Sequence, residues 1–269
     1  MIEFDAGSLH AYDTGEADRL PVVYHHGTPN IGAPPEPLFA DADRLGIRWI
    51  GYDRPGYGGS APDPGRDVAS AATCTARIAD ALGIERFAVL GHSGGGSHAL
   101  ACAALLPERV LAAVSISGLA PYGAEGLDWF AGMTSPAALR AAEQGREARE
   151  AYAAAPTEDD PFIAADWFAL EGVWGWFGKV VEPAMAAGPA AAIDDDLAYV
   201  MSWGFDPAVI DVPVLLAHGG RDACVPSSHS EWLAAHIPSA ELRISPDEGH
   251  ISILNPAAVP ALEWLARRR

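Results

Sequence analysis

A serine stands at the centre of the pattern Gly91-His92-Ser93-Gly94-Gly95. The apolar run Phe87–Leu90 precedes the pattern and a helix-forming stretch follows it, so a strand, a sharp turn and a helix are predicted. In such a turn the serine hydroxyl projects from the carboxyl end of a sheet. Gly91 and Gly95 supply the small residues against which neighbouring backbone packs. The pattern predicts Ser93 as a nucleophile.

A serine hydroxyl attacks poorly until a base takes its proton. Two predicted strands later in the chain, Val214–His218 and Glu241–Ser245, lead to Asp222 and His250. Each has a plainer interpretation by itself, a helix N-cap for Asp222 and an inconsequential loop residue for His250. The order Ser, Asp, His after three strands favours a catalytic triad. We predict His250 as the base and Asp222 as the acid that orients it.

The same chemistry requires donors for a developing oxyanion. A further strand, Val22–His26, is followed by His26-Gly27-Thr28-Pro29. The backbone N–H groups of Thr28 and Gly94 are predicted to form the oxyanion hole. His26 is interpreted as a residue that stabilises this turn, and His25 is left without a role.

Strands and helices alternate over most of the chain, which predicts an α/β fold with a mostly parallel sheet flanked by helices. The predicted strands are Ser8–Tyr12, Val22–His26, Arg48–Tyr52, Phe87–Leu90, Val110–Ser117, Val214–His218 and Glu241–Ser245. The predicted helices lie near Pro37–Leu45, Val68–Leu82, Gly96–Leu105, Ser228–His236 and Ala257–Arg267.

The alternation stops between Gly118 and Asp211, a segment with 16 acidic and 4 basic residues and five of the eight tryptophans. A structureless loop of this length is implausible in a compact domain. We therefore expect a mainly helical cap at 119–211, inserted late in the sheet of a core domain that comprises 1–118 and 212–269. Its aromatic residues either line an apolar pocket or bury the cap on the core.

The formal net charge of −19 excludes nucleic acid and anionic membrane as expected partners, because phosphates would be repelled. Three widely spaced cysteines predict reduced thiols in a cytoplasmic protein. Cys224 is two residues from Asp222. No signal peptide is seen, and no apolar run approaches the roughly 20 residues of a membrane span. A small-molecule substrate is the expected partner, and a homodimer is left open.

Four motifs give the chain a resemblance to the α/β-hydrolase superfamily, in the branch with esterases, prolyl aminopeptidases and cofactor-free haloperoxidases. They are His26-Gly27-Thr28-Pro29, Tyr52-Asp53-Arg54-Pro55-Gly56-Tyr57-Gly58-Gly59-Ser60, Gly91–Gly95 and the Asp222/His250 pair. The resemblance implies the α/β-hydrolase fold. It also implies that Asp53 and Arg54 are structural, holding loops near the oxyanion turn.

Two differences from known relatives reduce the number of activities that we expect for this chain. Prolyl aminopeptidases usually have His-Gly-Gly-Pro-Gly where this chain has His-Gly-Thr-Pro-Asn, and Ser93 disagrees with relatives that use an aspartate nucleophile. No histidine cluster predicts a metal site, and Asp194–Asp196 is interpreted as a solvated face or a helix start. We expect neither metal nor cofactor.

The predicted activity is hydrolysis of a carboxylic ester of a small or medium, largely apolar substrate through an acyl-enzyme. An aminopeptidase, with a cap carboxylate holding the substrate ammonium, is an alternative. The candidate carboxylates are Glu158, Asp159, Asp160, Glu171 and Asp194–Asp196. A carbon–carbon hydrolase or lyase on the same triad is another alternative, and a ligand receptor with vestigial hydrolysis is a third.

Overall fold

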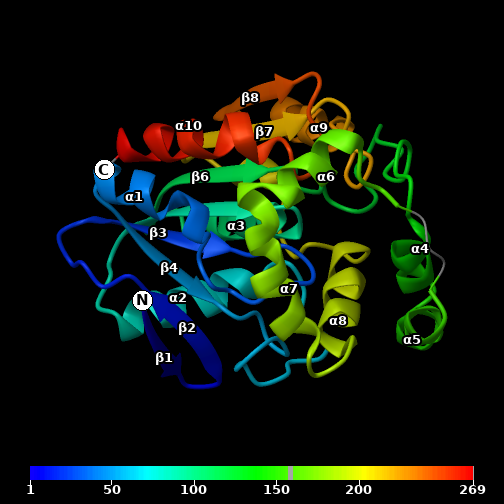
Figure 1. Cartoon of the computed structure of the whole chain (residues 1–269), viewed down its shortest axis with the longest axis horizontal. Helices are drawn as coiled ribbons and strands as arrows, with labels where there is room; N and C mark the ends of the chain where they lie inside the picture. Colours follow the sequence, from blue (N-terminus) through cyan, green and yellow to red (C-terminus); the bar gives the residue numbers. More distant parts are fainter. Residues whose placement is uncertain (157–159, 269) are drawn as a thin grey trace.

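The computed structural model of the protein describes residues 1–156 and 160–268. In this part of the chain eight strands form one sheet, in the order β1-β2-β4-β3-β5-β6-β7-β8 (Figure 1). The strands are β1 (Ile2–Ala6), β2 (Leu9–Asp13), β3 (Leu20–His25), β4 (Ile47–Tyr52), β5 (Phe87–His92), β6 (Val110–Ile116), β7 (Val214–Gly219) and β8 (Ala240–Ser245). The pairs β1–β2 and β2–β4 are antiparallel, and the other neighbours are parallel.

The central strands follow from their composition. Every residue of β4, β5 and β7 is buried, as expected of apolar strands covered on both faces. All seven predicted strands form, with ends displaced by at most two residues. β1 was not predicted, because its short alternation of apolar and acidic residues lies at the exposed edge of the sheet.

Helices cover both faces of the sheet, which confirms the predicted fold class. Ala42 of α1 (Phe39–Leu45) and Leu262 of α10 (Leu254–Ala266) belong to one apolar cluster. A second cluster holds residues of α2 (Ser70–Ala81), α3 (Gly94–Leu105) and α9 (Ser228–His236). Each of these helices falls on a stretch that was predicted to be helical.

Between β6 and β7 the regular secondary structure of the described residues is all helical, and loops join the helices. It contains α4 (Ala137–Glu143), α5 (Arg146–Ala154), α6 (Ala164–Glu171), α7 (Phe177–Met185) and α8 (Ala190–Tyr199). In Figure 1 the arrows of β6 and β7 point toward the side where α6, α4 and α5 lie. The division into a core and a separate cap domain at 119–211 stays a prediction. No helix within the described ranges is both long and apolar enough to cross a membrane.

Candidate active site

Ser93 occupies the turn between β5 and α3 with a φ of 57°. A positive φ is uncommon for a residue with a side chain and is a mark of backbone strain at functional sites. A side chain at Gly91 would collide with the carbonyl of Gly95, and one at Gly95 would collide with the carbonyl of His25. The turn therefore requires glycine at both positions that the sequence singled out.

The structure brings Ser93, His250 and Asp222 together from the ends of β5, β8 and β7. The hydroxyl of Ser93 lies 2.9 Å from Nε2 of His250, and Nδ1 of His250 lies 2.8 Å from Oδ2 of Asp222. His250 and Asp222 are buried, at 6% exposure each. The chain of two hydrogen bonds has the geometry in which a base removes the serine proton while an acid orients the base.

The surroundings of Asp222 keep it ionised. Burial opposes its charge, but His250 and His218 more than compensate, so the pKa of Asp222 lies below its ordinary value. Its Oδ1 accepts the backbone N–H groups of Cys224 and Val225, both at 2.9 Å. Burial likewise opposes the charge of His250, but the Asp222 carboxylate, followed by Asp166, raises the pKa of this imidazole. An imidazolium formed during proton transfer is therefore stabilised.

The predicted oxyanion donors flank the nucleophile. Neither the N–H of Thr28 nor that of Gly94 donates to another group in the part of the chain that the structure describes. Gly94 is the first residue of α3, where a helix leaves its N–H groups unpaired. Both donors are therefore free for an oxygen held beside Ser93.

The prediction that Asp194–Asp196 form a solvated face or a helix start is wrong. All three lie in the middle of α8 and are buried. Asp195 accepts hydrogen bonds from Arg54 at 2.6 Å and from the hydroxyl of Thr28 at 2.6 Å. Although burial opposes ionisation, Arg54 and Arg66 lower the pKa of Asp195. Sequence reasoning missed this because the partners are far apart in the chain.

This ion cluster holds the oxyanion turn in place. Arg54 donates to the carbonyl oxygens of His26 and Gly27, and its backbone N–H donates to Nε2 of His26 at 3.0 Å. These contacts agree with the structural role that the resemblance implies for Arg54 and with the interpretation of His26 as a residue that stabilises the turn. His25 instead lies in the core against Cys102, 3.5 Å from its Sγ.

Asp166 of α6 connects the helical segment to the loop that carries His250. It has no exposed surface, and its Oδ1 accepts the N–H groups of Ile251 and Ser252, both at 2.8 Å. Gly249 packs so closely on this carboxylate that a side chain there would collide with it. The position of the base is therefore tied to α6, and no motif in the sequence predicts this contact.

A pocket of about 390 Å³ opens beside Ser93 and His250. The rest of its lining is mostly apolar, and five lining residues come from the segment between β6 and β7: Phe162, Leu170, Phe177, Gly178 and Val181. Trp129, Phe130 and Trp203 instead belong to the apolar core. Some aromatic residues of the segment therefore line the pocket, and others are buried in the core.

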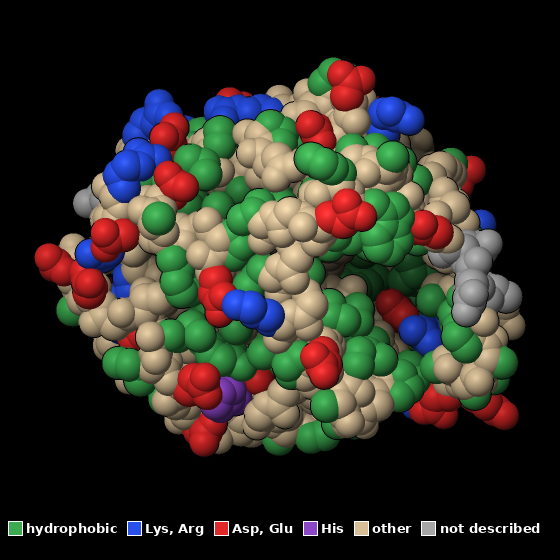
Figure 2. All heavy atoms as spheres, viewed as in Figure 1, with side chains coloured by type: hydrophobic (Ala, Val, Ile, Leu, Met, Phe, Trp, Pro, Cys, Tyr) green, Lys and Arg blue, Asp and Glu red, His purple; other side chains and the backbone are tan. Residues whose placement is uncertain are grey.

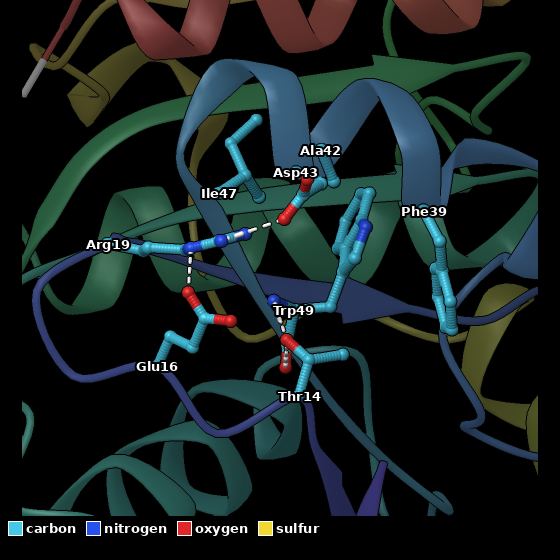
Figure 3. Close-up of a pocket in the computed structure, with 8 residues that line it drawn as sticks. All are labelled: Thr14, Glu16, Arg19, Phe39, Ala42, Asp43, Ile47 and Trp49. Atoms are coloured by element: carbon cyan, nitrogen blue, oxygen red, sulfur yellow. Dashed lines mark hydrogen bonds and ion pairs between the residues drawn. The ribbon is translucent and has the colours of Figure 1, made fainter.

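A second pocket, of about 250 Å³, lies between Thr14, Phe39 and Trp49 at the opposite end of the strands (Figure 3). Arg19, on its wall, pairs with Glu16 and, at 2.7 Å, with Asp43. Its charged groups thus satisfy one another, and no serine, cysteine or histidine lines it.

Ligand atoms of Asp222, Cys224 and His250 lie within 4.8 Å of one another, the one such group among the described residues that could hold a metal. Two of its members already share a hydrogen bond. Burial raises the pKa of the Cys224 thiol, which opposes the thiolate that a metal requires. The three cysteines are free thiols.

The sequence profile of the family described as alpha/beta hydrolase fold matches residues 21–257, and the chain belongs to this family. A non-heme chloroperoxidase of Streptomyces lividans is 30% identical over 94% of this chain and 95% of its own length. The pimeloyl-[acyl-carrier protein] methyl ester esterase of Nitrosomonas europaea is 27% identical over 92% and 94%. A thermophilic esterase from Thermogutta terrifontis shares the fold, with a TM-score of 0.66, 23% identity, and coverage of 96% and 93%.

Proposed function

We propose that the protein is a serine hydrolase that cleaves a carboxylic ester of a small or medium, largely apolar substrate. The observation that carries the proposal is the hydrogen-bonded series Ser93–His250–Asp222 at the wall of a mostly apolar pocket. The named ester hydrolase among the relatives supports it. Esters are favoured over amides because an alkoxide leaves more readily than an amine.

In the proposed mechanism Ser93 attacks the acyl carbon as His250 takes its proton. The N–H groups of Thr28 and Gly94 stabilise the tetrahedral oxyanion. His250 then protonates the departing alkoxide, which leaves an acyl group on Ser93. A water molecule, deprotonated by His250, releases the acid and restores the serine.

The aminopeptidase alternative has less support. It requires a carboxylate for the substrate ammonium, and no acidic residue is found among the described residues that line the pocket. Of the candidates, Asp194–Asp196 are buried in α8, and Glu158 and Asp159 lie outside the described residues. The carbon–carbon hydrolase, lyase and receptor alternatives are outcomes of the experiment below.

The test is turnover of p-nitrophenyl esters of graded chain length, beside amino-acid p-nitroanilides. We expect ester hydrolysis that Ser93→Ala reduces by about 10⁶-fold if the triad acts as a unit. Ser202→Ala, which removes an exposed serine, is the matched control and should leave the rate unchanged. Equal rates for wild type and Ser93→Ala on every ester would reject the proposal. Ser93-dependent anilide turnover alone would favour the aminopeptidase, and equal rates on both substrate sets would favour a carbon–carbon hydrolase, a lyase or a receptor.

A further inference from the structure

The pocket beside Ser93 contains few polar side chains. Of those, Ser93 and His250 bond to each other, and Nε2 of His92 donates to the carbonyl oxygen of His250 at 2.9 Å. The hydroxyl of Thr28 is held by the ion cluster around Asp195. Nδ1 of His92 is fully buried without a partner among the described residues, so it is not open to the pocket, and the other groups are already used by the triad or by the support of the oxyanion turn.

Asn30 is the exception. It lines the same pocket, the residue as a whole is 95% buried, and no hydrogen bond joins its side-chain amide to a residue in the described ranges, while neither amide atom is fully enclosed. The amide is therefore open to the pocket and has no partner of its own in the described part of the protein. A polar group that the protein leaves unpaired in an apolar pocket is therefore suited to pair with a ligand.

The amide lies close to the reacting centre. A Cβ placed on Gly27 would be 3.3 Å from Nδ2 of Asn30 and also 3.3 Å from Cβ of Ser93. Asn30 follows Thr28 by two residues, so it belongs to the oxyanion side of the site. The leaving alcohol must instead lie beside His250, which protonates it. A substrate group that reaches Asn30 thus belongs to the acyl half and lies a few bonds from the scissile carbonyl.

We propose that Asn30 selects esters whose acyl chain carries a hydroxyl or carbonyl group on the carbon α or β to the scissile carbonyl. The amide has both a donor and an acceptor, so it can pair with either group. The inference rests on the proposed ester hydrolysis and narrows its substrate class to hydroxy- and oxo-acyl esters. A plain acyl chain of the same length leaves the amide unpaired and is discriminated against.

The test compares four methyl esters: butyrate, 2-hydroxybutyrate, 3-hydroxybutyrate and 3-oxobutyrate, with proton release followed at constant pH. For wild type we expect kcat/KM of the best oxygenated ester to exceed that of butyrate by about 10- to 100-fold. Asn30→Leu, similar in shape and apolar, should bring this ratio close to one while butyrate is still hydrolysed. Val181→Ala, an apolar residue that also lines the pocket, is the control and should change all four esters without changing the ratio.

Equal kcat/KM for all four esters in wild type, or an unchanged ratio in Asn30→Leu, would overturn the inference while Ser93-dependent turnover left the proposed function intact. Binding provides a readout that does not depend on turnover. By ligand-observed NMR, Ser93→Ala should bind methyl 3-hydroxybutyrate or 3-oxobutyrate more tightly than methyl butyrate, and Ser93→Ala/Asn30→Ala should lose the difference. Equal binding of all esters to Ser93→Ala would also reject a role for Asn30.

Discussion

The helical segment between β6 and β7 has two sides that differ in composition and in role. On the α8 side, buried carboxylates pair with arginines, as in Asp195 with Arg54 and Asp196 with Arg149 at 2.7 Å. On the α6–α7 side, Leu170, Phe177 and Val181 form the apolar wall of the pocket. In Figure 2, which has the view of Figure 1, a hollow bordered by apolar side chains opens between the positions of α8 and α4, below α6, with acidic and basic side chains at its edge.

The α8 side anchors the oxyanion turn, whereas the α6–α7 side lines the pocket proposed for the substrate. A buried ion pair tolerates no loss of either partner, so α8 fixes the oxyanion turn rigidly. Apolar contacts tolerate changes of size and shape, so the α6–α7 wall can vary with the substrate. Asp166 is the one buried carboxylate of α6, and it holds the loop of the base. The acidic residues of this segment thus include buried carboxylates that hold the site in place, in addition to residues on the surface of the segment.

The largest effect on stability is expected for Asp195→Ala. Arg54 and Arg66 would be left buried without their carboxylate, which lowers the free energy of unfolding by about 3–5 kcal/mol. Because the native pKa of Asp195 lies below that of an unfolded Asp, this stabilisation is present above about pH 4 and is lost as the pH falls. Urea unfolding at pH 7 measures it, with exposed Glu182→Ala as the control. Equal losses for both variants would contradict the anchoring role.

Asp166→Asn tests whether α6 also acts on the base. The amide keeps an oxygen for Ile251 and Ser252 but removes a negative charge that raises the pKa of His250. The base must be neutral, so wild-type kcat/KM should fall as the pH drops through a value above about 6.5. In the variant this fall should move to lower pH, with kcat reduced by up to about tenfold. Glu171→Gln, on the exposed side of the same helix, should leave the profile unchanged. Coincident profiles for Asp166→Asn and wild type would reject the electrostatic link.

Leu170→Ala should act on the substrate more than on the fold. Its side chain lines the pocket and is only partly buried, so its removal should raise KM for medium-chain esters by about 5- to 20-fold. Leu139→Ala, a similarly buried leucine on α4, should leave KM unchanged. An equal change in KM for Leu170→Ala and Leu139→Ala would contradict a role of the α6–α7 wall in contact with the substrate.

The smallest effect is expected for Phe168→Ser. This side chain is 76% exposed on α6, so the free energy of unfolding should change by no more than about 0.5 kcal/mol. Urea unfolding at two protein concentrations is the measurement. A larger loss that depends on concentration would show that a second copy of the chain covers this face.

The triad and the fold could be predicted because their signals are local. Ser93, Asp222 and His250 each come within five residues after the end of a parallel strand, and the carboxyl ends of parallel strands meet at one edge. The ion cluster could not be predicted, because Arg54 and Asp195 are 141 residues apart and three adjacent acids resemble a solvated surface. Asn30 had one weak signal, its place directly after the oxyanion motif.

Covalent labelling of Ser93 tests the central claim most directly. A fluorophosphonate reacts with a serine that a base activates and leaves a stable adduct, which peptide mass spectrometry can locate. We predict one adduct per chain, on the peptide that contains Ser93, that is absent in Ser93→Ala and strongly slowed in His250→Ala. An adduct on another residue, or labelling that is equally fast in His250→Ala, would contradict the proposal that Ser93, His250 and Asp222 act as a catalytic triad.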